Sequence, residues 1–317
     1  MERNELPLIV TVTLNPAMDH TLEVDGLRVG EVNRVAFSTL DPGGKGVNVS
    51  RVLHELGGRS IAMGFVGGPV GRALEHAINE RGIADDFVHI PGNTRTNVMI
   101  TDRVAGTSTG FHEPGPVVAY RYLEELLRRL STYLLPDTWL VLAGSVPPGL
   151  PADVYREIMV LAHQRRCKVA LDTDGEPLRR GLEGRPYLVK PNRRELESLV
   201  GRSLPDLQAV VEAGLEIQRG GVAIVVVSMG AEGAVLLGER ERWLAVPPRV
   251  TVRSPVGAGD SMVAGIVLAL ARGEPLSEAL RLGTAAGAAT ALTPGTQLCR
   301  RADVEALLPS VSLRRLG

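Results

Sequence analysis

The stretch Ser254–Ser261 reads SPVGAGDS and leads directly into the apolar run Met262–Leu270. This pattern predicts a tight turn followed by a helix. The small residues 257–259 leave their backbone N–H groups open to an anion, and the start of a helix adds its positive dipole end. Because an aspartate repels a phosphate, its presence here suggests that Asp260 accepts a proton beside a reacting phosphoryl group. The alternative is that Asp260 only caps the helix.

Composition places the chain among ordinary globular proteins. Its 317 residues are 44% hydrophobic and 22% charged, enough for one large α/β domain or two smaller ones. A formal net charge of −1 gives no sign of nucleic-acid binding. No apolar run reaches the roughly 18 residues that a membrane helix needs. The first residues lack the pattern of a signal peptide, so we expect a cytoplasmic protein.

Cysteine and lysine are both scarce. Cys167 and Cys299 have no metal-ligand spacing, which fits a reducing compartment and no zinc site. Of the 35 basic residues, the only lysines are Lys45, Lys168 and Lys190. Because arginine is used almost everywhere else, a remaining lysine is a candidate for a position that needs a compact, flexible cation.

Apolar runs and helical patterns alternate along the chain and predict the α/β fold class, a mostly parallel sheet with helices on both faces. The runs that read as buried strands are Leu8–Leu14, Ser60–Val66, Trp139–Ala143, Lys168–Leu171, Tyr187–Val189 and Ala223–Val227. The helical patterns between them are Asn48–Leu56, Arg72–Arg81, Tyr120–Tyr133, Ala152–Arg165, Arg193–Val200 and Leu207–Gln218. The last third is predicted to end in helices, at Asp260–Ala271, Ser277–Ala291 and Ala302–Leu308.

Two stretches, Thr21–Thr39 and Thr96–His112, interrupt this alternation. They read as short strands with polar alternation and no helix between them. We expect them to form a small accessory sheet that covers the mouth of the main sheet. The chain, residues 1–317, is then one domain with lid segments at about residues 20–40 and 94–112.

A sheet of this size is not stable unless something apolar covers one of its faces. The first segment carries an apolar side made by Val24, Leu27, Val32, Val35 and Phe37. A second copy of the chain offers the same surface, and a self-complementary patch closes into a dimer. We therefore expect a homodimer that is joined through the lids.

The stretch Gly43–Asn48 reads GGKGVN and precedes a predicted helix. Backbone amides of the three glycines can line a polar ligand, and Asn48 can both donate hydrogen bonds to hydroxyls and accept them. Glycine rather than serine or threonine follows Lys45, so this is not a Walker A loop. The alternative is a flexible hairpin with Asn48 as a helix cap. The candidate substrate-binding residues here are Gly43, Gly44, Lys45, Gly46 and Asn48.

Three further candidate residues follow predicted strands or open the second polar stretch. Asp19 lies beyond the first strand, where a carboxylate can hold a pair of sugar hydroxyls, although it can also cap a proline turn. Arg95 can clamp a phosphate through its planar fork, although surface arginines are abundant in this chain. Ser145 lies in the small-residue loop GSVPPG after the strand Trp139–Ala143.

The segments after the next two strands suggest a nucleotide and a metal. Lys190 and Asn192 follow one strand, and Glu195 comes one helical turn later. Asn192 and Glu195 could hold a hydrated Mg²⁺. Alternatively, Glu195 is a first-turn carboxylate favoured by the helix dipole. The glycines of Ser228–Gly233, which reads SMGAEG, would allow close approach of a nucleotide, or the segment is an ordinary hairpin connection.

Other enzyme classes find little support. Gly64–Gly71 is rich in glycine but lacks the dinucleotide spacing, so a nicotinamide enzyme is not indicated. The histidines show no metal-ligand spacing, and no Ser/His/Asp or Cys/His constellation stands out. By contrast, the candidate motifs fall at predicted strand ends, where open α/β sheets bind their ligands.

Together these segments resemble the phosphofructokinase-B branch of the ribokinase-like carbohydrate kinases, from about Leu8 to Leu308. The two most specific marks are Gly43–Asn48 and Val256–Ser261. The resemblance implies a central sheet flanked by helices and a β lid that often pairs two subunits. It also implies ATP with Mg²⁺ as the phosphoryl donor.

The resemblance also implies roles for individual residues. Asp260 would be the base, and Gly257, Ala258 and Gly259 the anion hole. The sugar phosphate would be held by Asp19, Gly43, Gly44, Asn48 and Arg95, with Lys45, Gly46 and Ser145 in the same substrate site. Arg34 would reach the phosphate of the neighbouring subunit. The residues facing ATP would be Lys190, Asn192, Ser228, Gly230, Glu232 and Gly233, with Glu195 at Mg²⁺. A monovalent cation, usually K⁺, often sits behind the anion hole, here at Ser254, Val256, Thr293 and Gly295.

Within the branch, Gly43–Gly46, Thr94-Arg95 and Glu113–Pro116 look most like 1-phosphofructokinases. The chain departs from that pattern at His112, Pro255 and Asp174, where Asn, Thr or Ser, and Ser are usual. We expect ATP-dependent phosphorylation of a ketohexose phosphate, first of all fructose 1-phosphate to fructose 1,6-bisphosphate. The alternatives are 6-phosphofructokinase or tagatose-6-phosphate kinase activity and, in another class, a non-catalytic sugar-phosphate sensor. Binding alone does not require Asp260, which argues against the sensor.

Overall fold

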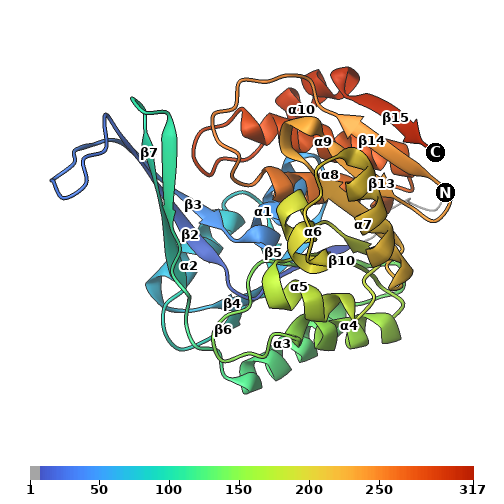
Figure 1. Cartoon of the computed structure of the whole chain (residues 1–317). Coiled ribbons are helices and arrows are strands. Elements are labelled where there is room, and N and C mark those ends of the chain that lie inside the picture. Colours follow the sequence, from blue (N-terminus) through green and yellow to red (C-terminus); the bar gives the residue numbers. More distant parts are fainter. Residues whose placement is uncertain (1–7) are drawn as a thin grey trace.

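The computed structural model describes residues 8–317, which form a large sheet covered by helices and a small sheet that projects from it (Figure 1). The large sheet has 11 strands. Its parallel strands are β1 (Ile9–Thr13), β4 (Ser60–Val66), β5 (Ala84–Asp85), β6 (Val88–His89), β9 (Trp139–Ala143), β10 (Lys168–Asp172), β11 (Leu188–Val189) and β12 (Ile224–Ser228). The α/β class expected from the sequence is confirmed.

One edge of the large sheet is antiparallel. It consists of β13 (Ala234–Leu237), β14 (Arg242–Val246) and β15 (Ser312–Leu316). The loop between β12 and β13 is therefore a hairpin connection. The prediction that the last third ends in helices is wrong in one respect, because the chain closes with the edge strand β15.

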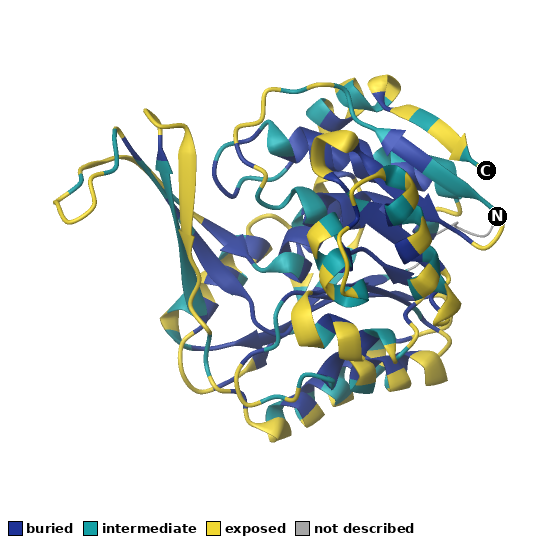
Figure 2. Cartoon of the chain, in the orientation of Figure 1, coloured by how far each residue is buried: buried dark blue, intermediate teal, exposed yellow. Residues whose placement is uncertain are grey.

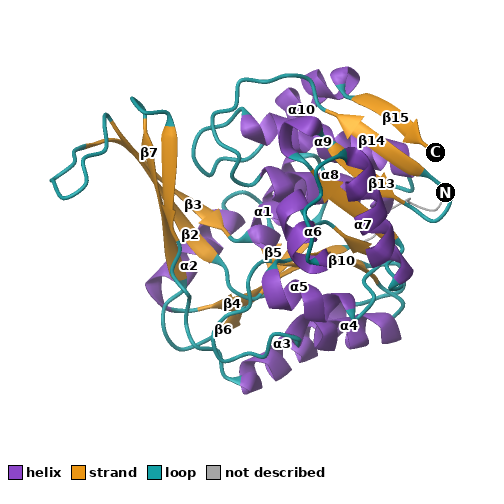
Figure 3. Ribbon diagram, in the orientation of Figure 1, coloured by secondary structure: helices purple, strands orange, loops and turns teal. Residues whose placement is uncertain are grey.

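Helices cover both faces of the large sheet (Figure 3). One face carries α3 (Tyr120–Tyr133), α4 (Val154–Gln164), α5 (Gly175–Leu182), α6 (Arg193–Val200) and α7 (Leu207–Arg219). The other carries α1 (Lys45–Glu55), α8 (Ala258–Ala271), α9 (Leu276–Ala291) and α10 (Arg301–Leu307). Successive residues of a strand point to opposite faces, so the strands feed two separate cores. In β9, Leu140 and Leu142 pack under α3 and α4, whereas Val141 packs under α8.

The small sheet has the order β3-β2-β7-β8, with β3 (Val35–Gly43), β2 (Ala17–Val24), β7 (Arg95–Asp102) and β8 (Thr107–Phe111). Its base packs on α2 (Gly68–Asn79), and its outer part is largely exposed (Figure 2). It contains both polar stretches that interrupt the α/β alternation. Val24, however, is buried within the chain and adds nothing to an exposed apolar side.

The parallel strands end at a common edge of the large sheet. In the register of β9 and β10, Ala143 lies opposite Asp172, and β1 and β9 end level with each other. The loops that follow these strands therefore meet beside the small sheet and the start of α8. Among residues 8–317, no helix is long and apolar enough to cross a membrane.

Candidate active site

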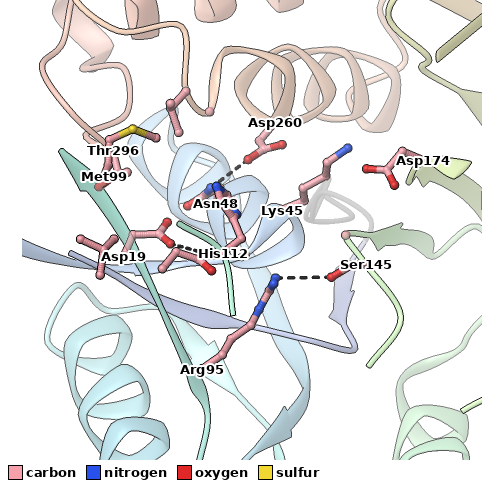
Figure 4. A pocket seen from close by; sticks show the side chains of 16 residues that line it. Asp19, Lys45, Asn48, Arg95, Met99, His112, Ser145, Asp174, Asp260 and Thr296 are labelled. Carbon is pink, nitrogen blue, oxygen red and sulfur yellow. Dashed lines mark hydrogen bonds between the residues drawn. The ribbon is translucent and has the colours of Figure 1, made fainter. Parts of the chain in front are cut away.

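A cavity of about 460 Å³ lies between the small sheet, the strand ends and the first turn of α8 (Figure 4). Its polar lining residues are Asp19, Lys45, Asn48, Arg95, Asn97, His112, Ser145, Asp174, Asp260 and Thr296, together with Gly44, Gly144 and Gly257. The structure thus brings together residues from both ends of the sequence, as the strand-end motifs predict.

The first turn of α8 presents Asp260 to this cavity. Gly257 is the residue before the helix and has φ of 78°, a left-handed conformation that favours glycine. Asp260 is 7% exposed and lies inside the helix, so the reading of Asp260 as the cap is wrong. It is the only charged residue of an otherwise apolar, buried helix. A charged side chain at such a place is costly and points to a chemical role.

The surroundings of Asp260 raise its pKa to about 6. Burial is the main cause, and the neighbouring Asp172 carboxylate adds to it. Lys45, Lys190 and a hydrogen bond from Asn48 act in the opposite direction. Asn48 Nδ2 donates this bond to Asp260 Oδ2 at 2.8 Å. The carboxylate is therefore ionised at neutral pH and can still accept a proton readily.

Two lysines share one buried carboxylate behind the cavity. Asp172 is 1% exposed, and its Oδ1 lies 3.2 Å from Lys45 Nζ and 3.5 Å from Lys190 Nζ. Although burial alone would raise the pKa of Asp172, the two ammonium groups hold it below its usual value. Asp172 was not among the residues singled out from the sequence. A charged residue that ends the buried run VALD was the available signal.

Lys190 also reaches the first turn of α8. A Cβ on Gly259 would come within 3.3 Å of Lys190 Nζ, so this glycine leaves room for the ammonium group. Two lysines and a positive helix end then lie together with two buried carboxylates, Asp172 and Asp260. The ammonium groups and the backbone N–H groups at the start of the helix suit a polyanion.

Arg95 is held at the opposite end of the cavity. Its guanidinium donates to the backbone carbonyls of Asn15 (2.9 Å) and Glu113 (3.0 Å) and, more weakly, to Ser145 Oγ (3.4 Å). These bonds fix the plane of the fork at the rim of the cavity. A planar, fixed guanidinium is suited to a phosphate group.

Asp19 faces the same cavity from β2. It is 8% exposed and accepts a hydrogen bond from Asn97 Nδ2 at 2.8 Å. Burial raises the pKa of Asp19, while Asn97, Arg51 and Arg95 counteract it. Gly43 lies directly against this carboxylate, because a Cβ there would collide with Asp19. The glycine thus serves close packing of two strands, and only Gly44 beside it lines the cavity.

A second cavity of about 650 Å³ lies on the other side of the first turn of α8. Its walls are mainly apolar and include Pro247, Val250, Val252, Met262, Gly287 and Ala288, with Ser228, Gly230 and Gly233 at one end and Ala258 and Gly259 at the other. Such walls suit a flat aromatic ring. The sequence reasoning included the Ser228–Gly233 loop but missed the segment 247–252 and the small residues of α9.

Several predicted residues lie outside both cavities. Gly46 packs on Thr13, where a side chain would collide. Glu232 pairs with Arg193 at 2.7 Å on the surface and does not line the second cavity. Arg34 is exposed and belongs to the outer part of the small sheet. Residues 8–317 contain no group of three or more His, Cys, Asp or Glu side chains that could hold a metal ion.

Asn192 and Glu195 form a helix cap. Asn192 Oδ1 accepts from the Glu195 backbone N–H at 2.9 Å, and Glu195 Oε2 accepts from the Asn192 N–H at 2.8 Å. This is a reciprocal capping box. Glu195 is therefore a first-turn carboxylate, as the alternative interpretation of the sequence expected. The capping bond uses one of its two carboxylate oxygens, Oε2.

The residues proposed around a monovalent cation do come together. Ser254 Oγ donates to the Gly295 carbonyl at 2.6 Å and accepts from the Val256 N–H at 3.3 Å. Thr293 Oγ1 lies 2.6 Å from the Gln297 carbonyl and 2.8 Å from that of Thr290. The loop oxygens are thus bonded to hydroxyl groups of the chain.

Comparison with known proteins identifies this arrangement. The model of the family described as pfkB family carbohydrate kinase matches residues 9–303. The chain belongs to this family. The 1-phosphofructokinase of Bacillus subtilis is 36% identical over 98% of this chain and 100% of its own length, and that of Rhodobacter capsulatus is 41% identical over 87% and 88%.

A 6-phosphofructokinase has about the same sequence identity to this kinase as these 1-phosphofructokinases have. The ATP-dependent 6-phosphofructokinase isozyme 2 of Mycobacterium tuberculosis is 38% identical over 94% of this chain and 88% of its own. Among solved structures, phosphofructokinase-2 from Escherichia coli in complex with potassium has a TM-score of 0.91 and 32% identity, covering 96% of this chain and 99% of that one. The chain is therefore a carbohydrate kinase with the complete fold of these relatives.

The raised pKa of Asp260 predicts a cost in stability. The pKa of Asp260 rises from an ordinary 3.8 to about 6 on folding. The protonated carboxyl group therefore makes a favourable contribution to the free energy of unfolding below pH 3.8, and this contribution is lost as the pH rises through 6. We expect Asp260→Asn to increase the free energy of unfolding above pH 6 by up to about 3 kcal/mol. Urea unfolding at pH 5 and pH 8 measures this. Asp303→Asn, outside both cavities, is the control, and an equal gain at both pH values for Asp260→Asn would contradict the prediction.

Proposed function

We propose that this kinase transfers a phosphoryl group from ATP to a ketohexose phosphate, with fructose 1-phosphate as the preferred acceptor and fructose 1,6-bisphosphate as the product. One observation carries the proposal. The first turn of α8 separates a polar cavity from an apolar one, and it presents Asp260 to the first and the Gly259 backbone to the second. A phosphoryl group that passes between the two ligands would cross this turn.

The polar cavity suits a phosphorylated sugar. Asp19, Asn97 and Asn48 offer acceptors and donors for hydroxyl groups, and Arg95 offers a fixed guanidinium for the phosphate. The apolar cavity suits the adenine ring, with the Ser228–Gly233 loop beside it. Kinases for fructose 1-phosphate and for fructose 6-phosphate are similarly related to this chain, so 6-phosphofructokinase activity is the second candidate.

To catalyse phosphoryl transfer, a protein mainly has to align the two substrates and stabilise the negative charge on the transferred group. The Asp260 carboxylate takes the proton of the attacking sugar hydroxyl while the new O–P bond forms and the bond to the leaving ADP breaks. The backbone N–H groups of residues 257–259 and the ammonium groups of Lys45 and Lys190 hold the negative charge on the moving phosphoryl group. Asn48 orients the base throughout.

The residues present fit a magnesium ion. Glu195 uses only Oε2 in its helix cap and acts on Lys45 through its charge, and the buried Asp172 Oδ2 has no hydrogen-bond partner among the described residues. Mg²⁺ accepts such oxygens together with water and phosphates. When bound, it neutralises phosphate charge on the donor. For K⁺ the fit is poorer, because the Gly295 carbonyl already accepts a hydrogen bond from the Ser254 hydroxyl.

The small sheet is proposed as the lid over the polar cavity and as the dimer contact. In the register of its strands, Asp19 and Asn97 share the face toward the cavity. The opposite face carries Leu22, Leu40, Ile100 and Phe111, of which Leu40 and Phe111 are more than half exposed. Phe37, expected on the dimer side, lies on the cavity side instead, because it pairs with Glu23, whereas Val35 pairs with Val24 after a shift in register. A partner subunit would cover the outer face.

The function is tested by ADP release with fructose 1-phosphate, fructose 6-phosphate, tagatose 6-phosphate and unphosphorylated fructose. We expect turnover to be fastest with fructose 1-phosphate. Asp260→Asn should lower kcat by about 10²–10⁴-fold, because a general base of this kind contributes that much. Calorimetry should show that the variant still binds the sugar phosphate. Binding without turnover in the wild-type chain would support the sensor instead.

Arg95→Ala should raise KM for the phosphorylated sugar far more than KM for ATP. A charge-assisted contact to a half-buried phosphate is worth about 1.5–3 kcal/mol, or roughly tenfold to over a hundredfold in KM. Arg103→Ala is a matched control, since Arg103 follows the far end of β7 and pairs with the exposed Asp25. An unchanged KM for the sugar phosphate in Arg95→Ala would place the phosphate elsewhere.

Phe111→Glu should convert the dimer into monomers, because it puts a charge in the middle of an apolar contact. Ser108→Glu adds the same charge to the same strand on the cavity face and should leave the dimer intact. Light scattering at assay concentration measures both. A wild-type chain that is monomeric and fully active there would refute the dimer.

A further inference from the structure

The Asn48 carboxamide lies between two groups of opposite hydrogen-bonding character. Its Nδ2 donates to Asp260 Oδ2 at 2.8 Å, and its Oδ1 accepts from Arg51 Nη1 at 3.2 Å. An arginine can only donate and an ionised carboxylate can only accept. Of the two orientations of the amide, related by a half-turn, only one satisfies both neighbours.

Arg51 is itself firmly held. It lies one helical turn after Asn48 on α1, and its side chain is 9% exposed. Its Nη1 donates to the Pro42 carbonyl at 2.7 Å, and its Nη2 lies 3.4 Å from Asp41 Oδ1. Asp41 Oδ2 in turn accepts from Thr296 Oγ1 at 3.2 Å. The guanidinium therefore bridges the base of β3 and the Asn48 side chain.

We propose that Arg51 is a positioning residue for Asp260, acting by fixing the Asn48 carboxamide with its donor toward the base. This proposal rests on the proposed function, in which Asp260 accepts the hydroxyl proton. Without Arg51 the amide is free to turn, and Oδ1 then meets the Asp260 carboxylate. Two acceptors face each other in that state, and only a protonated Asp260 relieves the conflict.

The direction of the resulting effect follows from the groups around Asp260. Asn48 and Lys45 face it from α1, Asp172 from the end of β10 and Lys190 from the segment after β11. The hydrogen bond from Asn48 lowers the pKa of Asp260 against the effect of burial. Arg51 and Asp260 also attract each other through space. Removal of Arg51 therefore raises the pKa of the base by both routes.

The test is the pH dependence of kcat with fructose 1-phosphate and ATP. Arg51→Met should move the acid limb upward by about one pH unit, equivalent to about a fivefold loss of kcat at pH 6 and about a tenfold loss at pH 5, with little loss at pH 9. KM for both substrates should change less than threefold. Arg81→Met is the matched control, because Arg81 Nη2 lies 4.0 Å from the same Asp41 carboxylate but has no contact with Asn48. The acid limb of the pH profile should therefore not move in Arg81→Met. An unchanged limb in Arg51→Met would overturn the proposal.

A second comparison separates positioning from charge. In an Asn48→Ala background, Arg51→Met should shift the acid limb by much less than one pH unit, because the amide that Arg51 orients is gone and only the through-space attraction remains. A shift of the full size there would assign the effect to the arginine charge and overturn the proposal. Arg51→Lys keeps the charge but cannot bridge Pro42, Asp41 and Asn48 together, so it should still shift the acid limb. It replaces Arg51→Met if that variant does not fold. A wild-type limb in Arg51→Lys would equally assign the effect to charge.

Failure of this proposal is distinguishable from failure of the proposed function. Wild-type turnover in Asp260→Asn would remove Asp260 as the base, whatever Arg51 does. A readout besides activity is the stability gain of Asp260→Asn as a function of pH. In an Arg51→Met background, that gain should continue to rise to a pH about one unit higher before it levels off, because it levels off at the pKa of the folded state. A gain that levels off at the wild-type pH would show that Arg51 does not act on the base.

Discussion

The whole site depends on the complete burial of helix α8. Its residues from Asp260 to Ala269 are buried, and Gly265 lies so close to α9 that a Cβ would come within 2.9 Å of the Gly283 backbone. Two helices in such contact cannot shift independently, because overpacking costs about 1–3 kcal/mol. The start of α8 is thereby fixed at the level where the parallel strands end. A closely packed helix thus holds the backbone N–H groups of its first turn and the Asp260 carboxylate in one unit.

The same burial creates an electrostatic problem that shapes the surroundings of the helix. The positive end of α8 lies beside Lys190, and Lys45 is close by, so three positive groups meet away from bulk water. Asp172 and Asp260 compensate the two ammonium groups. Breaking a buried ion pair costs about 3–5 kcal/mol, so Asp172 holds the two lysines in place. The ammonium groups and the helix N–H groups are donors suited to a polyphosphate, and the raised pKa of Asp260 is the other consequence of burial.

The sequence predicted the tight turn before α8 and most of the helices and strands, because glycines at strand ends and apolar periodicity are local signals. It could not reveal Asp172, since a carboxylate that ends a strand looks like a turn residue until the partners of its charge are known. The faces of the small sheet were misjudged for a related reason. Alternation shows two faces, but a shift of one residue exchanges them. Only the pairing of β2 with β3 and β7 shows that Phe37 shares a face with Asp19.

Arg51 illustrates the same limit at the level of a single hydrogen bond. In the sequence it is one of many arginines, on a helix whose notable residue is Asn48. Its meaning comes from contacts with segments far apart in the chain, since Asp41 and Pro42 lie in β3 and Thr296 lies beyond α9. The small sheet and the loop after α9 are thus joined to the base through one guanidinium and one amide. Because Pro42 is part of β3, a movement of the small sheet against α1 acts first on the bond to Arg51, and the orientation of Asn48 depends on that bond. Through Arg51 and Asn48, α1 therefore links the base of the small sheet to the Asp260 carboxylate.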